Sequence, residues 1–162
     1  MKKRIGLFGS YKFMSILYQN NKSLPVYNYV TNKLNLTYDV LNFSKANLTI
    51  SSICVLAKQM TKVFNLKDIY LSLGETEASL DGDNLMLFMN DIKRSLNDLF
   101  SYLKDNKINA NILLLEEDSI NNKTINDVIR SLSRIYNITI INDEPKFSII
   151  GNNRYILNSL YI

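Results

Sequence analysis

Short apolar runs alternate with longer segments of helical period along the whole chain, and this alternation constrains the fold more than any other feature. Five runs have the length and apolar content of strands that are buried on both faces, as in a parallel sheet. They span residues 4–8, 38–43, 69–73, 111–115 and 138–142. Strands that alternate with helices predict an α/β sandwich with a mainly parallel, five-stranded sheet and right-handed crossovers.

Between these runs, apolar residues recur at steps of three and four, which is typical of helices that bury one face. Asp83 or Asn84 is the predicted cap of the clearest helix. In the first crossover, a helix is expected to begin near Pro25 and to run to about Leu34. The three clearest stripes comprise Ile53, Leu56, Ala57, Met60, Val63 and Phe64; Leu85, Phe88, Ile92, Leu96, Leu99 and Leu103; and Ile125, Val128, Ile129 and Leu132.

The chain has the size and composition of one globular domain. Its 162 residues are enough to bury about two-thirds of the surface of the unfolded chain in a single core. A hydrophobic content of 46% with 21% charged residues argues against disorder. Because no repeat, linker or change of composition divides the sequence, residues 1–162 are predicted to form a single domain.

Composition also narrows the classes of function. The net charge is only +4 and the basic residues are scattered, so we expect no nucleic-acid partner. No apolar run approaches the roughly 18 residues that a membrane span requires, and the N-terminus does not resemble a secretory signal. Cys54 is the single cysteine, which suits a reducing compartment and a buried thiol. These features predict a cytoplasmic location.

Polar residues follow the predicted strands, and ligands of open α/β sheets bind at the carboxyl ends of the strands. The stretch after the first strand reads LFGSY at 7–11. The second is followed by NFSKANLT at 42–49, and the third ends in LGETE at 73–77. Near the C-terminus, residues 153–158 read NRYILN.

In this order, the four stretches resemble the conserved blocks of the SGNH hydrolases, also called GDSL lipases and esterases. The resemblance covers almost the whole chain and implies a flavodoxin-like, three-layer α/β/α sandwich. In that family, the first block carries the nucleophilic serine. The glycine amide of the second block and the asparagine amide of the third stabilise the oxyanion, and the last block supplies aspartate and histidine.

The chain departs from this pattern at the residues that carry the chemistry. Without a gap, Tyr11 takes the place of the family's nucleophile, and a deletion of one residue would give that role to Ser10. Ser44 replaces the glycine of the second block, although its backbone amide can still donate. Thr76 replaces the asparagine of the third block. The positions of the aspartate and histidine correspond to Asn153 and Ile156, and the sequence contains no histidine.

Several acidic residues also follow the strands, Glu75, Glu77 and Glu116 among them. Such carboxylates could hold a hard cation such as Mg²⁺ or act as a base with a raised pKa. Acidic residues are also common at helix starts, where the helix dipole favours them. This commoner explanation of the acidic residues leaves no metal predicted, and because no nucleotide-binding glycine motif is present, no cofactor is predicted either.

The expected loss of reaction rate decides between an active hydrolase and an inactive relative of one. Loss of triad members leaves about 10³–10⁴-fold acceleration over water. Loss of an oxyanion donor costs a further factor of roughly 10²–10³. The sequence therefore predicts a catalytically impaired SGNH-like protein, a pseudoenzyme, retained for binding a small-molecule ligand or for assembly.

Two alternatives remain open. The first is an active ester hydrolase with Ser10 as nucleophile and either a carboxylate base, such as Glu75 or Glu77, or a histidine supplied by a partner. The second is a module that binds Mg²⁺ or a phosphorylated ligand. The apolar residues after 156 would favour self-association if they leave a sheet edge open.

Overall fold

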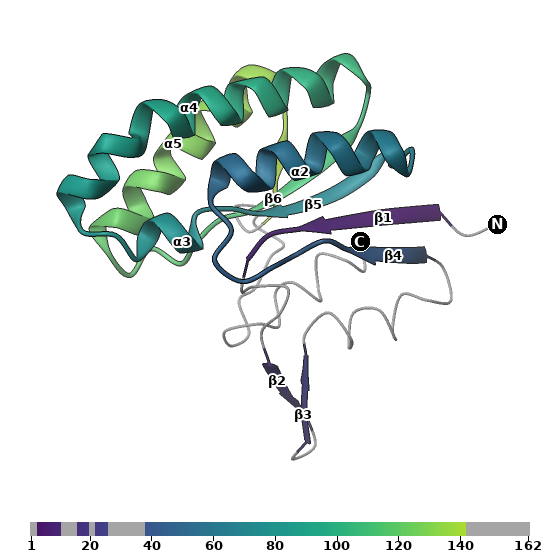
Figure 1. Cartoon of the computed structure of the whole chain (residues 1–162), viewed down its shortest axis with the longest axis horizontal. Helices are drawn as coiled ribbons and strands as arrows, with labels where there is room; N and C mark the ends of the chain where they lie inside the picture. The colour runs from purple at the N-terminus through teal and green to yellow at the C-terminus, as the bar shows by residue number, and fades with distance from the viewer. Residues whose placement is uncertain (1–2, 11–15, 20–21, 26–37, 142–162) are drawn as a thin grey trace.

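A parallel sheet of five strands, with order β4-β1-β5-β6-β7, forms the centre of the molecule. The computed structural model describes residues 3–10, 16–19, 22–25 and 38–141 (Figure 1). The strands are β1 (Lys3–Phe8), β4 (Tyr38–Asn42), β5 (Asp68–Ser72), β6 (Asn109–Leu113) and β7 (Thr139–Ile140). All neighbouring pairs are parallel, so the predicted α/β fold with a five-stranded parallel sheet is confirmed.

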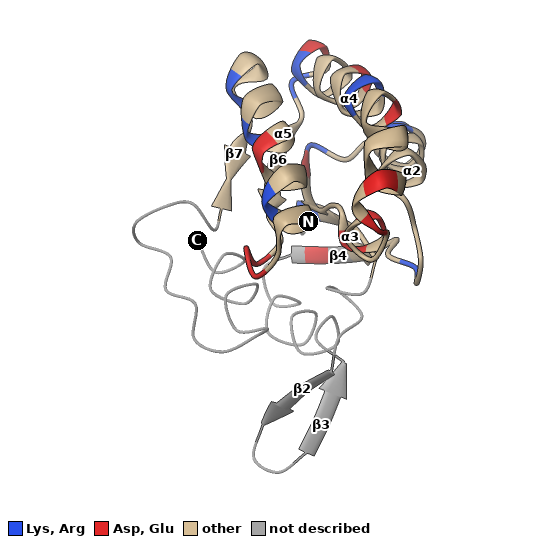
Figure 2. Cartoon of the chain, turned by 90° about the vertical axis from the view of Figure 1, so that its left-hand side faces the viewer, with Lys and Arg blue, Asp and Glu red and all other residues tan. Residues whose placement is uncertain are grey.

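Three long helices pack side by side on one face of this sheet (Figures 1 and 2). They are α2 (Ile50–Val63), α4 (Gly82–Asp105) and α5 (Ile120–Tyr136), and the short α3 (Glu75–Ala78) follows β5. The core between helices and sheet is apolar and includes Phe8, Ile53, Leu71, Leu96 and Ile129. The residues that would form the second helical layer of the predicted three-layer sandwich lie outside the described ranges.

The boundaries of several elements differ from the prediction. β6 begins two residues earlier than expected and ends at Leu113, although Leu114 and Leu115 remain buried. The cap of α4 is neither Asp83 nor Asn84: Asp81 caps the helix by accepting a hydrogen bond from the Asn84 amide at 2.9 Å. An N-cap side chain reaches the amide three residues ahead, which places the cap earlier than the apolar stripe suggests.

Two predicted core positions are wrong. Phe88 is 49% exposed and Val63 is 69% exposed, whereas Met89 is buried. In a helix of 3.6 residues per turn, Met89 shares the face of Leu85 and Ile92, and Phe88 lies on its flank. Val63 is the last residue of α2, where the helix leaves the core.

A hairpin precedes β4 that the sequence did not predict. Residues β2 (Ile16–Gln19) and β3 (Lys22–Pro25) pair as an antiparallel two-stranded sheet. Pro25 therefore ends a strand, which suits an edge position where no amide needs a partner. Beyond Pro25, the helix expected to run to about Leu34 lies within residues 26–37, which are outside the described part.

Candidate functional site

The candidate site begins where β1 ends. Ser10 is 1% exposed, and its Oγ has no hydrogen-bond partner among the described residues. The Gly9 carbonyl accepts a hydrogen bond from the Lys45 amide at 3.3 Å, which places the segment after β4 beside Ser10. A buried hydroxyl without a partner is uncommon, because burying it costs free energy that a hydrogen bond normally offsets.

The segment after β4 carries a second unpartnered hydroxyl. The Ser44 Oγ is buried and has no partner within the described residues. The Ser44 amide, expected to face an oxyanion, instead donates to Asn42 Oδ1 at 3.0 Å. Asn42 is the last residue of β4, and its side chain thus closes a short turn on the amide two residues later.

The turn after β5 depends on Gly74, whose φ of 101° is in the left-handed region. A Cβ at Gly74 would also lie 2.7 Å from Ile125 Cγ2. Two residues later, the Thr76 hydroxyl donates to the Leu48 carbonyl at 2.7 Å. A hydroxyl has one proton to donate, so Thr76 in this arrangement offers none to a ligand.

Glu77 makes the second connection between the β5 turn and the segment after β4. Its Oε2 accepts a hydrogen bond from the Ile50 amide, at the start of α2, at 2.7 Å. The side chain is 5% exposed, and Oε1 has no partner among the residues described. Burial raises the pKa of Glu77 above its ordinary value, although the hydrogen bond from Ile50 opposes that shift.

These contacts join three segments at one edge of the sheet, as expected for the carboxyl ends of adjacent parallel strands. Ser10, Ser44, Thr76 and Glu77 all belong to them. Three of the buried polar oxygens there, Ser10 Oγ, Ser44 Oγ and Glu77 Oε1, are without partners within the described ranges. This edge therefore holds two hydroxyl groups and one carboxyl oxygen that the described residues leave without a hydrogen-bond partner.

The other predicted acids behave differently. Glu75 Oε1 accepts a hydrogen bond from Ser72 Oγ at 3.0 Å, and the Glu116 carbonyl accepts one from Asn122 at 2.7 Å. Among the described residues, no group of three or more cysteine, aspartate or glutamate side chains is placed to hold a metal ion. Tyr11, Asn153 and Ile156 lie outside the described residues.

Sequence reasoning missed one buried polar residue near this edge and underrated another. Asn126 in α5 is fully buried and binds both the amide and the carbonyl of Leu115, at 3.1 and 2.8 Å. A polar residue beside Ile125 and Ile129, within an apolar stripe, was the available signal. Glu77 was identified as an acidic residue that follows a strand, but nothing in the sequence indicated its bond to Ile50.

In the part of the chain that the structure describes, the remaining charged and reactive groups do not indicate a second catalytic or metal-binding site. Basic and acidic residues are interspersed over the described helices (Figure 2). Burial raises the pKa of Cys54 to about 12, so its thiol stays protonated at neutral pH. None of the helices in the described part is long and apolar enough to span a membrane.

Comparisons with known proteins give a match by structure alone. No protein-family model matches the sequence, and no curated protein matches it. The structure is similar to a lipase/acylhydrolase from Enterococcus faecalis, with a TM-score of 0.67 and 15% identity over 98% of this chain and 93% of that one. It is also similar to AlinE4, an SGNH-hydrolase family esterase, with a TM-score of 0.63 and 12% identity over 99% and 92% of the two chains.

A third similar structure is Axe2, an acetylxylan esterase from Geobacillus stearothermophilus. It has a TM-score of 0.64 and 10% identity over 86% of this chain and 75% of that one. Catalytic mutants of Axe2 in which a serine, an aspartate or a histidine is replaced by alanine have been solved. At these identities the likeness establishes the fold, which is the fold of SGNH hydrolases and related esterases.

Proposed function

We propose that this chain is an SGNH-hydrolase-like protein with a degenerate active site, which binds a small acyl or ester ligand without hydrolysing it efficiently. The observation that carries the proposal is the internal use of both oxyanion positions. The Thr76 hydroxyl donates a hydrogen bond to the Leu48 carbonyl, and the Ser44 amide donates one to Asn42 Oδ1. A donor already engaged within the protein cannot stabilise a developing charge unless its first bond breaks or is shared.

The absence of histidine supports the same conclusion. A serine hydroxyl is a weak nucleophile until a positioned base removes its proton. The chain has no histidine, and Ser10 Oγ has no hydrogen-bond partner in the part of the chain described. The two unpartnered hydroxyls and the carboxyl at this edge remain suited to hold a carbonyl or hydroxyl group of a ligand.

Hydrolysis of p-nitrophenyl acetate tests the proposal. We expect the wild type, Ser10→Ala and Glu77→Gln proteins to show the same background rate. Ser101→Ala, a half-buried serine of α4, is the matched control for removal of a hydroxyl. Turnover above background that disappears in Ser10→Ala but survives in Ser101→Ala would overturn the proposal.

Thermal unfolding tests the binding part. Acetate, butyrate and ethyl acetate are suitable probes, because they carry the acyl and ester groups without a good leaving group. A ligand at about a hundred times its dissociation constant stabilises the folded state by about 2.7 kcal/mol. We expect that stabilisation to fall in Ser10→Ala and Ser44→Ala, but not in Ser101→Ala. No stabilisation by any of the probes would leave the proposal without its ligand class and count against it.

One observation favours a second function, an active ester hydrolase in which Glu77 is the base. Its carboxyl group is buried, its Oε1 is unpartnered in the described residues, and its pKa is raised by burial. A carboxylate whose pKa is shifted toward neutrality is suited to general base catalysis. Labelling of Ser10 by a fluorophosphonate, lost in Glu77→Gln, would support this function. The histidine of a partner protein is the other source of a base, and labelling that requires that partner would distinguish it.

A further inference from the structure

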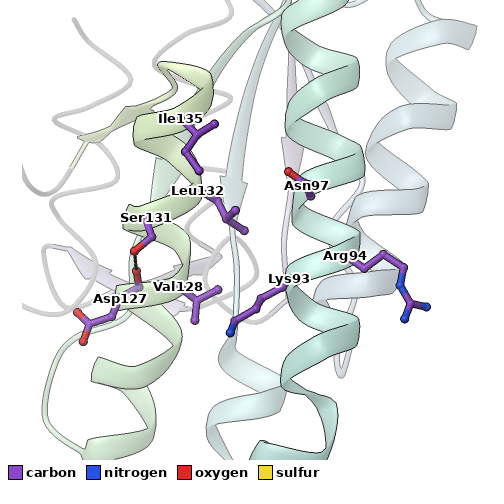
Figure 3. A pocket seen from close by; sticks show the side chains of 8 residues that line it. All are labelled: Lys93, Arg94, Asn97, Asp127, Val128, Ser131, Leu132 and Ile135. Atoms are coloured by element: carbon purple, nitrogen blue, oxygen red, sulfur yellow. Dashed lines mark hydrogen bonds between the residues drawn. The ribbon is translucent and has the colours of Figure 1, made fainter.

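The outer surface of the helical layer contains a groove between α4 and α5, with a volume of about 740 Å³ (Figure 3). Val128, Leu132 and Ile135 line it from α5, and Lys93 and Asn97 line it from α4. It lies on the helices rather than at the carboxyl edge of the sheet. None of its lining residues belongs to the candidate site, so the groove is a separate feature of the surface.

The α5 wall of the groove is apolar at helical spacing. Val128, Leu132 and Ile135 follow one another at steps of four and three, and they point toward α4 in Figure 3. Ile135 is 66% exposed, although an isoleucine usually lies in the interior. An open apolar stripe of this spacing between two helices is typical of grooves that receive one face of an amphipathic helix.

The charged residues of the groove differ in whether an opposite charge pairs with them. Asp127 is paired with Lys123 at 2.9 Å and with Arg130 at 3.3 Å, and its side chain points away from α4 (Figure 3). Arg94 pairs with Asp91 at 3.6 Å and points away from α5 (Figure 3). Lys93 extends toward the groove, and no carboxylate pairs with it among the described residues (Figure 3). The groove therefore presents an apolar wall and the ammonium group of Lys93, which no carboxylate in the described part of the chain pairs with.

We propose that this groove binds an amphipathic helix of a partner protein that places an acidic residue opposite Lys93. The apolar face of that helix would cover Val128, Leu132 and Ile135, and its carboxylate would complement the ammonium group. A second copy of this chain is a poorer occupant. Its own groove would offer Lys93 little, because Asp127, the acidic residue among the described lining residues, is already paired with Lys123 and Arg130.

A synthetic helix provides the probe. Two peptides of 16 residues would share leucines at steps of three and four, and would differ only in glutamate or lysine at the position that faces Lys93. Fluorescence anisotropy measures their binding to the full chain. We expect the glutamate peptide to bind about tenfold more tightly than the lysine peptide. We expect Lys93→Glu to reverse that preference.

Two further variants locate the binding surface. Ile135→Ser removes the most exposed apolar residue of the groove and should weaken the glutamate peptide about fivefold. Val63→Ser is the matched control, because Val63 is 69% exposed at the end of α2 and outside the groove. Both sites are exposed, so neither variant should disturb folding. The proposal is overturned if neither peptide binds at about 1 mM, if Lys93→Glu leaves the preference unchanged, or if Val63→Ser weakens binding as much as Ile135→Ser.

Discussion

Two turns at the same edge of the sheet each bury a polar side chain, and they treat it differently. After β6, the amide group of Asn126 binds the Leu115 amide through its oxygen and the Leu115 carbonyl through its nitrogen. After β5, the carboxyl group of Glu77 binds the Ile50 amide through one oxygen and leaves the other without a partner among the described residues.

This difference indicates a structural role for Asn126 and makes Glu77 the candidate for a functional role. A neutral amide has one donor and one acceptor side. Asn126 uses both to bind the backbone of Leu115, which lies two residues beyond the end of β6. A carboxyl group in the same surroundings must either carry a buried charge or donate a proton, and no described residue is placed to accept a proton from Oε1 of Glu77. A buried, titratable group without a full set of partners and with a perturbed pKa is more typical of functional sites than of cores.

The largest effect should come from the satisfied turn. Asn126→Leu keeps the size of the side chain but leaves the buried amide and carbonyl of Leu115 without partners. Each unsatisfied group costs about 1–3 kcal/mol, so we expect the free energy of unfolding to fall by about 4 kcal/mol in urea denaturation. Asn109→Ala is the control, since the exposed Asn109 side chain donates one long hydrogen bond, of 3.3 Å, to Asp68 Oδ1 and no other side-chain bond is seen within the described residues. If the free energy of unfolding fell by less than about 1 kcal/mol, Asn126 would not have the structural role inferred from its two hydrogen bonds.

Gly74→Ala tests how closely the two turns are packed together. The alanine would adopt an unfavourable φ, at about 1–2 kcal/mol, and its Cβ would meet Ile125, the neighbour of Asn126, at about 1–3 kcal/mol. We expect a loss of about 3 kcal/mol in the same denaturation experiment. Gly82→Ala, with nothing within 4 Å of the added Cβ, should be neutral or stabilising. Equal behaviour of the two variants would mean that the β5 turn adapts freely.

The sequence predicted the sheet and its edge because both depend on patterns of nearest neighbours. Apolar runs such as 69–73 mark strands, and parallel strands bring the residues that follow them to one edge. Exposure of Phe88 could not be predicted in this way, because the position of a residue on the flank of a stripe depends on where the neighbouring helices end. The β2–β3 hairpin was missed because its strands carry little alternation and Pro25 suggested a helix start.

The chemistry of the site was less accessible to the sequence than its location. Ser10, Ser44, Thr76 and Glu77 were all singled out by their place after a strand. What each side chain binds depends on contacts across 27 or 28 positions, as between Glu77 and Ile50 or Thr76 and Leu48. Such pairings are set by how α2 meets the β5 turn, which no local pattern encodes.

The pH dependence of stability sharpens the comparison further. Because the pKa of Glu77 is raised in the folded state, the native protein holds this proton at pH values where the unfolded chain has lost it. Stability should therefore fall as the pH rises from the ordinary glutamate value, about 4.3, through the raised value, by about 1.4 kcal/mol for each unit of pKa shift. Glu77→Gln removes this dependence, and urea denaturation from about pH 4 to pH 8 measures it.

Glu117 provides a control of opposite sign. A hydrogen bond from Arg130 is the main cause that lowers the pKa of Glu117. Its contribution is therefore present above the ordinary glutamate pKa and lost as the pH falls through the lowered value. Glu117→Gln should leave the fall in stability between pH 5 and 8 unchanged. Identical pH profiles for the wild type and Glu77→Gln would show that burial does not perturb the Glu77 carboxyl, and the contrast with Asn126 would lose its basis.

The smallest effect concerns the first of the two connections between the β5 turn and the segment after β4, the hydrogen bond from Thr76 to Leu48. Thr76→Val keeps the shape of the side chain and removes the hydrogen bond to the Leu48 carbonyl, so we expect a loss of about 1 kcal/mol in the free energy of unfolding. Thr124→Val is the control, because the Thr124 hydroxyl donates to the carbonyl of Ile120 within its own helix and at an exposed site. That change should stay within about 0.5 kcal/mol. If Thr76→Val costs no more than Thr124→Val, the Thr76 hydroxyl is not committed to Leu48 and is free to serve a ligand. The proposal of impaired hydrolysis would then lose one of its two supports, because the third-block oxyanion position would be available to a ligand.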